Sequence, residues 1–123
     1  MLGESKAFSG FAVDDVEKAK AFYADTLGLE TSEENGLMTL HLAGDRPTLV
    51  YPKPDHEPAA YTILNFPVED IEAAVDALME RGVAFEIYED SGQDEKGIMR
   101  QYGPPIAWFR DPAGNILSVI ELD

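Results

Sequence analysis

The stretch FAVDDVEKA, from Phe11 to Ala19, recurs as FPVEDIEAA, from Phe66 to Ala74. The second copy begins 55 residues after the first. Each copy continues a short β-type run, residues 7–13 in the first and 61–68 in the second, into a pattern of helical spacing. Because the same strand-to-helix step occurs twice, the sequence indicates a duplicated structural module.

Both helical patterns have one apolar face and similar ends. We expect Asp14 to cap the first helix, with Glu17 completing a capping box, and Asp70 to cap the second. Gly28 and Gly82 follow the two helices, at the position where the chain needs a left-handed residue to leave a helix. The apolar faces consist of Val16, Ala19, Phe22 and Tyr23 in the first helix and of Ile71, Ala74, Val75 and Leu78 in the second.

Three strands are predicted after each helix. The hairpin signal Asn35-Gly36 separates two strands of the first module, and a turn with Pro112 and Gly114 separates two of the second. The predicted strands are residues 29–33, 37–43 and 48–51 in the first module and 83–89, 106–110 and 116–121 in the second. The sequence therefore predicts an α+β fold with two tandem βαβββ modules, at about 6–52 and 61–122, and a Pro-rich linker at about 53–60.

Length and composition predict a single domain over residues 1–123. A chain of 123 residues with 45% hydrophobic and 27% charged residues is typical of a soluble protein with one core. No apolar run approaches the roughly 20 residues that cross a bilayer, and the first residues do not resemble a signal peptide. We therefore expect a cytoplasmic protein without a membrane partner. The absence of cysteine excludes disulfides, thiolate metal sites and a cysteine nucleophile.

The strongly acidic charge also limits the choice of partners. The formal net charge of −15, from 24 acidic and 9 basic residues, would repel a phosphate backbone, so we expect no nucleic acid partner. The acidity either attracts a cationic ligand or simply keeps the surface solvated. We favour the solvated surface, because runs of charge are usually exposed faces.

Three segments carry a resemblance to a known family: residues 11–29, their repeat at 66–83, and WFRDPAGN at 108–115. With these segments the chain resembles the vicinal oxygen chelate superfamily, which includes glyoxalase I, extradiol dioxygenases, fosfomycin-resistance transferases and bleomycin-resistance proteins. The resemblance covers almost the whole chain. It implies a cup-shaped mixed sheet with a ligand site on the floor of the cup, and it implies a homodimer. It does not identify one activity, because one fold serves many functions.

The resemblance also implies where metal ligands would stand. Metal-dependent members place His, Gln or Glu at four strand positions, which correspond here to Phe8, to Val50 or Tyr51, to Ile63 and to Ser118. None of these residues is a carboxylate or an imidazole, and divalent ions need several such groups. We therefore expect no metal and no other cofactor, and the resemblance to glyoxalase I does not extend to its metal-dependent chemistry.

The catalytic candidates are few. His41 alternates with Leu40 and Leu42, which predicts that its side chain lies on the face away from the helices. His41 and Tyr51 are the only side chains we single out as catalytic candidates. A half-exposed strand histidine without a chemical role explains His41 more simply.

The candidates for ligand binding are more numerous. Asn65 and Ser118 interrupt apolar strands, where a buried polar group needs a partner, either a ligand or the protein itself. For Ser118 we favour a ligand, because the resemblance implies that this residue points into the cup. Residues 91–104 form a long loop, either a lid or a mobile surface loop, in which Lys96 and Arg100 would hold an anionic or carbonyl-bearing ligand. The full set of predicted ligand-binding residues is Phe8, Tyr51, Ile63, Asn65, Arg100, Tyr102, Trp108 and Ser118.

Three functional hypotheses follow from these residues. The leading one is metal-independent binding of a small organic molecule in an apolar cup. The second is a lyase, isomerase or dioxygenase of the same superfamily with an atypical active site. The third is an interaction module whose cup is filled by its own side chains.

Overall fold

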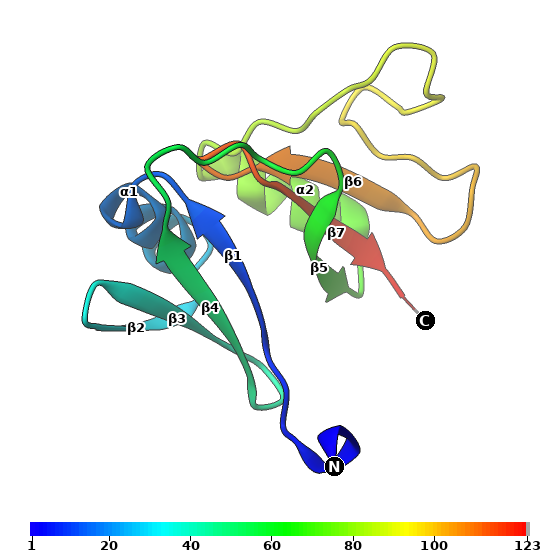
Figure 1. The fold of residues 1–123 in the computed structure, drawn as a ribbon. Coiled ribbons are helices and arrows are strands. Elements are labelled where there is room, and N and C mark those ends of the chain that lie inside the picture. The colour runs from blue at the N-terminus through cyan, green and yellow to red at the C-terminus, as the bar shows by residue number, and fades with distance from the viewer. Residues whose placement is uncertain (123) are drawn as a thin grey trace. The chain divides into compact units, whose positions relative to one another are not determined.

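The strands of the first half form one mixed sheet in the order β1-β4-β3-β2. The computed structural model describes residues 1–122 (Figure 1). β1 runs parallel to β4, whereas β4, β3 and β2 are antiparallel neighbours. Asn35 and Gly36 both have positive φ angles, 54° and 80°, and close the predicted hairpin between β2 and β3. The strands span Ser9–Val13 (β1), Glu30–Glu34 (β2), Leu37–Leu42 (β3) and Arg46–Pro52 (β4).

The first helix covers one face of this sheet. Helix α1 spans Val16–Lys20 and continues as a π-helical segment, Ala21–Thr26, after which Gly28 has the predicted positive φ of 75°. Tyr23 is completely buried, and its ring lies 5.7 Å from that of Phe11 on β1. The other buried apolar side chains here are Val13, Ala19, Met38, Leu40 and Val50. Residues of β1, β3 and β4 thus contribute alternate side chains to one core face.

Asp15, rather than the predicted Asp14, caps helix α1. The Asp15 Oδ1 accepts hydrogen bonds from the amides of Glu17, at 3.0 Å, and Lys18, at 3.2 Å. The prediction was wrong by one residue because two consecutive aspartates follow the strand, and only Asp14 has a glutamate, Glu17, three residues later as the capping box requires. Backbone geometry decides between them, since Asp15 is the last residue in an extended conformation, with φ −140° and ψ 107°.

Replacing Asp15 with alanine is expected to destabilise the protein by about 1 kcal/mol, because two amides of the first helical turn lose their acceptor. The matched variant Asp14→Ala removes the same charge without removing the cap, and is expected to cost less than about 0.5 kcal/mol. Urea unfolding of both variants measures the difference. Equal losses of stability in the two variants would contradict the assignment of the cap to Asp15.

The second half forms a smaller mixed sheet in the order β5-β7-β6, with β5 parallel to β7 and β6 antiparallel to it. The elements span Thr62–Val68 (β5), Ile71–Glu80 (α2), Ile106–Arg110 (β6) and Ile116–Glu121 (β7). Asp70 caps α2 as predicted, because its side chain accepts a hydrogen bond from the amide of Ala73 at 3.1 Å. Gly82 follows the helix with a φ of 89°, which confirms the second predicted helix end.

Helix α2 packs on one face of the β5-β7-β6 sheet (Figure 1). Its buried residues, Ile71 and Val75, belong to the same core as the buried strand side chains Ala107, Phe109, Leu117 and Val119. The side chain of Glu121 also accepts a hydrogen bond from the amide of Ile71 at 3.0 Å. This contact ties the start of α2 to the end of β7.

The strand predicted at residues 83–89 does not form. Among the backbone contacts of the described residues, only an isolated bridge between Phe85 and Phe109 and one hydrogen bond, from the Glu86 amide to the Trp108 carbonyl, join this segment to β6. The side chain of Gln93 bonds the next backbone groups instead: it accepts from the Tyr88 amide at 2.7 Å and donates to the Glu86 carbonyl at 2.8 Å. Because Gln93 takes groups that a strand ladder would use, the second module is βαββ with an irregular edge.

The chain divides into two compact units, unit 1 (Met1–His56) and unit 2 (Glu57–Asp123). Their boundary lies inside the linker predicted at about 53–60. Within residues 1–122, no helix is long and apolar enough to cross a membrane.

Candidate functional site

Three of the predicted ligand-binding residues lie in one row across the unit 2 sheet. Ser118 on β7 is the registered partner of Asn65 on β5 and of Trp108 on β6. Registered partners in a sheet project to the same side, so the three side chains share one face. Leu117 and Val119, the neighbours of Ser118, are buried on the opposite face, toward α2. We call the face that bears Asn65, Ser118 and Trp108 the Ser118 face.

The row is held together by a side-chain hydrogen bond. The Ser118 hydroxyl donates to the Asn65 Oδ1 at 2.5 Å. Ser118 is completely buried, whereas Asn65 is exposed, so the buried hydroxyl is satisfied by an amide that also reaches the surface. No buried side-chain N or O atom within residues 1–122 lacks a hydrogen-bond partner. Ser118 therefore already has a protein partner, one of the two alternatives open for it on sequence alone.

Aromatic and aliphatic groups surround this polar pair. The ring of Tyr88 lies 5.9 Å from that of Trp108 in an edge-on arrangement, and Tyr88 is 40% exposed. The same face also bears Ile116 and Ile120, each two residues from Ser118 along β7, and Ile106, two residues from Trp108 along β6. Ile63 is half-buried and stands at a bulge of β5, where the register with β7 shifts. The Ser118 face is thus mainly apolar with one amide at its centre.

The predicted ligand-binding residues of unit 1, Phe8 and Tyr51, lie on the sheet face away from α1. Val50 is fully buried on the α1 side, so Tyr51, its neighbour, points to the opposite side and is 40% exposed. Phe8 precedes β1 and is 63% exposed. Alternation along β1 places Phe8 on the same side as Tyr51, because Val13 lies in the core on the other side.

His41 lies on that same face of unit 1, as alternation predicts, but does not meet Tyr51. Its Nε2 is 2.7 Å from the hydroxyl of Ser32 on β2, and its registered partner on β4 is Pro47. Tyr51 lies four residues further along β4, about 13 Å away at roughly 3.3 Å per residue. General acid–base catalysis needs the two groups within hydrogen-bond reach of one substrate atom, so these two do not form a catalytic pair.

Arg100 lies away from the Ser118 face. Its guanidinium donates to the side chains of Asp94, at 2.6 Å, and of Glu72 on helix α2, at 2.9 Å. Lys96 likewise pairs with Asp76 on α2, at 2.9 Å. Both cations of the predicted lid are therefore neutralised by carboxylates, and the loop is fastened to the helix that covers the opposite face of the sheet. Tyr102 is 78% exposed beyond this fastened part.

Asp94 organises the loop. Its Oδ1 accepts hydrogen bonds from the amides of Lys96, at 2.8 Å, and Ile98, at 3.0 Å. Burial by itself raises the pKa of Asp94, but hydrogen bonds from Arg100 and from these two amides, with the Arg100 charge, outweigh it and hold the pKa below its ordinary value. The same contact with Asp94 raises the pKa of Arg100. This carboxylate is thus charged throughout the neutral and weakly acidic range.

Replacing Asp94 with alanine is expected to open the loop. Amide hydrogen exchange at Lys96 and Ile98 should accelerate roughly tenfold at neutral pH, because both amides lose a charged acceptor. Since the folded pKa of Asp94 is lowered, its contribution is present above the ordinary pKa of an aspartate and is lost as the pH falls through the lower folded value. In strong acid, the exchange rates of these two amides in the wild type should therefore approach the rates in the variant. Glu95→Ala, an exposed neighbour, is the control, and an equal effect from it would contradict the assignment.

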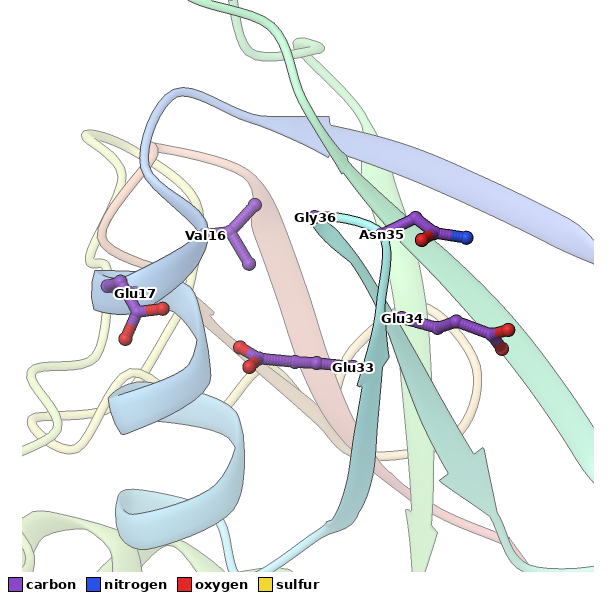
Figure 2. Close-up of a pocket in the computed structure, with 6 residues that line it drawn as sticks. All are labelled: Val16, Glu17, Glu33, Glu34, Asn35 and Gly36. Atoms are coloured by element: carbon purple, nitrogen blue, oxygen red, sulfur yellow. The ribbon is translucent and has the colours of Figure 1, made fainter.

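Two hollows flank the tip of the β2–β3 hairpin in unit 1. One, of about 310 Å³, lies between the hairpin and α1 and is lined by Val16, Glu17, Glu33, Glu34, Asn35 and Gly36. In Figure 2 the Glu33 side chain points toward α1, and those of Glu34 and Asn35 point away from it. The other, of about 330 Å³, is lined by Ser32, Glu33, Glu34, Asn35, Leu37, Thr39 and Leu49. Neither contains a predicted site residue, and both are edged by carboxylates.

The residues at the implied metal positions do not fit a metal ion. Phe8 and Ile63 have no donor atom, and the Ser118 hydroxyl is already engaged with Asn65. Tyr51 is an isolated phenol on the sheet of unit 1. Within residues 1–122, no three His, Asp or Glu side chains are grouped closely enough to hold a metal ion. Metal sites in proteins need several such ligands at fixed distances.

Tyr88 and the three isoleucines of the Ser118 face were missed by the sequence analysis. The isoleucines had a usable signal, because they stand two positions from Ser118 or Trp108 on predicted strands. Tyr88 had a weaker one, since residues 83–89 were expected to form a regular strand.

Comparisons with known proteins agree with this architecture. A family model described as the Glyoxalase/Bleomycin resistance protein/Dioxygenase superfamily matches residues 8–119. A member of the same superfamily from Sphaerobacter thermophilus is 27% identical, with a TM-score of 0.71 and coverage of 98% of this chain and 100% of that one.

Two further solved structures show the same fold. An antibiotic binding protein from Streptomyces sp. CB03234 is 24% identical, with a TM-score of 0.71 and coverage of 98% of both chains. A fosfomycin resistance protein from Listeria monocytogenes is 15% identical, with a TM-score of 0.71 and coverage of 98% and 94%. A search of curated proteins found no significant match.

Proposed function

Because the chain belongs to the Glyoxalase/Bleomycin resistance protein/Dioxygenase superfamily, we propose that it binds a small organic molecule on the Ser118 face without a metal ion. The observation that carries this proposal is the row Asn65–Ser118–Trp108, in which an amide and an indole are surrounded by apolar side chains. Sites for small molecules typically combine an apolar lining with a few fixed polar groups. The row has this composition.

The side chains at the implied metal-ligand positions support binding without a metal ion. Ser118 stands at an implied ligand position and gives its hydroxyl proton to Asn65, and Ile63 stands at another with a hydrocarbon side chain. In the relative from Streptomyces, the same fold belongs to an antibiotic binding protein. That protein illustrates that the fold is compatible with ligand binding, while the ligand of the present chain is set by its own residues.

Nuclear magnetic resonance with a library of small organic molecules tests the proposal. On protein treated with a chelator, binding molecules are expected to shift the resonances of Asn65, Ser118 and the Trp108 indole. Resonances of Glu33 and Asn35 at the hairpin of unit 1 serve as the reference for non-specific shifts. A library that shifts only resonances away from the Ser118 face, or none at all, would contradict the proposal.

We also propose that the protein is a homodimer. β1 is an edge strand of its sheet and consists of SGFAV, with no charged residue or proline to prevent pairing. Light scattering should give twice the monomer mass of 13.5 kDa. A mass of one chain would contradict this part of the proposal.

A further inference from the structure

The hydrogen bond between Ser118 and Asn65 fixes which end of the amide faces outward. A hydroxyl has one proton to donate, and the Asn65 Oδ1 receives it. The reversed amide would turn Nδ2 toward Ser118 and leave the proton of the buried hydroxyl without this acceptor. Oδ1 therefore faces Ser118, and the two N–H groups on Nδ2 face away from it. Since the Asn65 side chain is exposed, these donors are accessible to a ligand.

A charged side chain on the same face, Arg110, is already neutralised. Arg110 lies two residues from Trp108 on β6, which places it on the Ser118 face. Its Nε donates to the Glu86 carboxylate at 2.8 Å, and its Nη1 donates to the Gly114 carbonyl at 3.0 Å. A ligand on this face therefore meets N–H donors but no unpaired charge from Arg110. Such a surface favours a neutral acceptor over a carboxylate or an ammonium group.

The aromatic side chains of Trp108 and Tyr88 add a second requirement for the ligand. Trp108 is half-buried beside Ser118 in the row, and Tyr88 is edge-on to it. A flat ring system gains contact area against an indole and loses little conformational entropy. The isoleucines of the face, Ile106, Ile116 and Ile120, offer further apolar contact.

Building on the proposed function, we infer that the Ser118 face selects neutral, planar aromatic molecules that carry a carbonyl oxygen. The ring lies against Trp108, and the carbonyl oxygen accepts a hydrogen bond from the Asn65 Nδ2. Asn65 is the specificity-determining residue, and Ser118 is the positioning residue that orients its amide.

A matched pair of probes isolates the carbonyl. 9-Fluorenone and fluorene share the same flat three-ring frame and differ in one carbonyl oxygen. Trp108 is the only tryptophan of the chain, so its fluorescence reports binding on this face, with the dissociation constant taken from the titration midpoint. The wild type should bind fluorenone about three- to tenfold more tightly than fluorene, the effect of one neutral hydrogen bond.

Three variants separate the roles of the two side chains. Asn65→Asp keeps an acceptor for Ser118 but has no N–H donor, so the preference for fluorenone should fall to one or below. Ser118→Ala frees the amide to rotate, and should reduce the preference to about twofold without changing the affinity for fluorene. Gln101→Glu, an exposed amide-to-acid change in the same unit, should retain the wild-type preference.

A second readout follows the amide directly. The side-chain N–H resonances of Asn65 should shift downfield with fluorenone and much less with fluorene. The inference is overturned if the wild type binds both probes equally, binds neither, or keeps its preference in Asn65→Asp. Equal binding of both probes would leave the proposed function intact, because that function is decided by the library screen.

Discussion

Replacing Phe109 with alanine is expected to destabilise the protein by about 3–5 kcal/mol, the usual cost of removing a fully buried phenylalanine. Phe109 is 1% exposed on the central part of β6, and its ring lies 5.5 Å from that of Phe85. The alanine leaves a cavity and removes one of the contacts that hold the irregular segment 83–89 on the sheet. Total stabilities are commonly about 5–15 kcal/mol, so this loss is a large fraction of the whole.

Urea unfolding measures this loss against two related variants. Met79→Ala removes an apolar side chain that is 48% exposed on α2, and is expected to cost less than about 1 kcal/mol. Should Phe109→Ala not fold, Phe109→Leu preserves most of the volume and is expected to cost about 1–2 kcal/mol. A loss for Phe109→Leu no larger than that for Met79→Ala would contradict the core described for unit 2.

Replacing Trp108 with leucine is expected to weaken binding of a planar aromatic ligand by about 10- to 100-fold. Stacking of a flat ring on an aromatic side chain is commonly worth about 1–3 kcal/mol, and leucine retains only the apolar contact. Trp108→Phe keeps a ring and should lose less than about tenfold. Since both variants lack the indole fluorophore, affinities are measured by nuclear magnetic resonance titration with 9-fluorenone.

The control for this prediction is Tyr61→Leu, which removes an aromatic side chain that is 71% exposed just before β5. It should leave the affinity within about twofold of the wild type. The prediction fails if Trp108→Leu binds 9-fluorenone as tightly as the wild type, or if Tyr61→Leu weakens binding to the same extent.

Capping residues, glycines and turn residues made the helix ends and two strands of unit 2 predictable from the sequence. Gly28 and Gly82 have the left-handed φ angles that the helix ends required, and Asp70 caps α2 as its position indicated. β6 and β7 match the predicted ranges residue for residue, because Pro112 and Gly114 limit the turn between them. The cap of α1 was less certain, since Asp14 and Asp15 differ only in backbone conformation.

Contacts made by individual side chains decided what the pattern did not. Residues 83–89 have strand-like composition, yet the Gln93 amide bonds the backbone of Glu86 and Tyr88 and replaces a regular ladder. The residues of α2 likewise determine where Arg100 lies, because Glu72 attracts its guanidinium. The pairing of Arg100 with Glu72, 28 residues away, leaves no local signature in a single sequence.

The candidate site was partly predictable for a similar reason. Asn65, Ser118 and Trp108 each stood out locally, as polar residues within apolar strands or as a strand aromatic. Their alignment in one row depends on the register of β5, β7 and β6, which the sequence does not specify. Phe8, Tyr51 and His41 belong to unit 1, and the role predicted for them is a separate hypothesis.

Ligand binding with and without metal tests the central claim most directly. The dissociation constant of 9-fluorenone is measured from Trp108 fluorescence on chelator-treated protein, then again with added Zn²⁺, Ni²⁺ or Fe²⁺. The account predicts the same constant within about twofold in all four samples, because the row Asn65–Ser118–Trp108 contains no carboxylate and no imidazole. A tenfold or greater tightening with one of these ions, lost in Ser118→Ala, would contradict metal-independent binding.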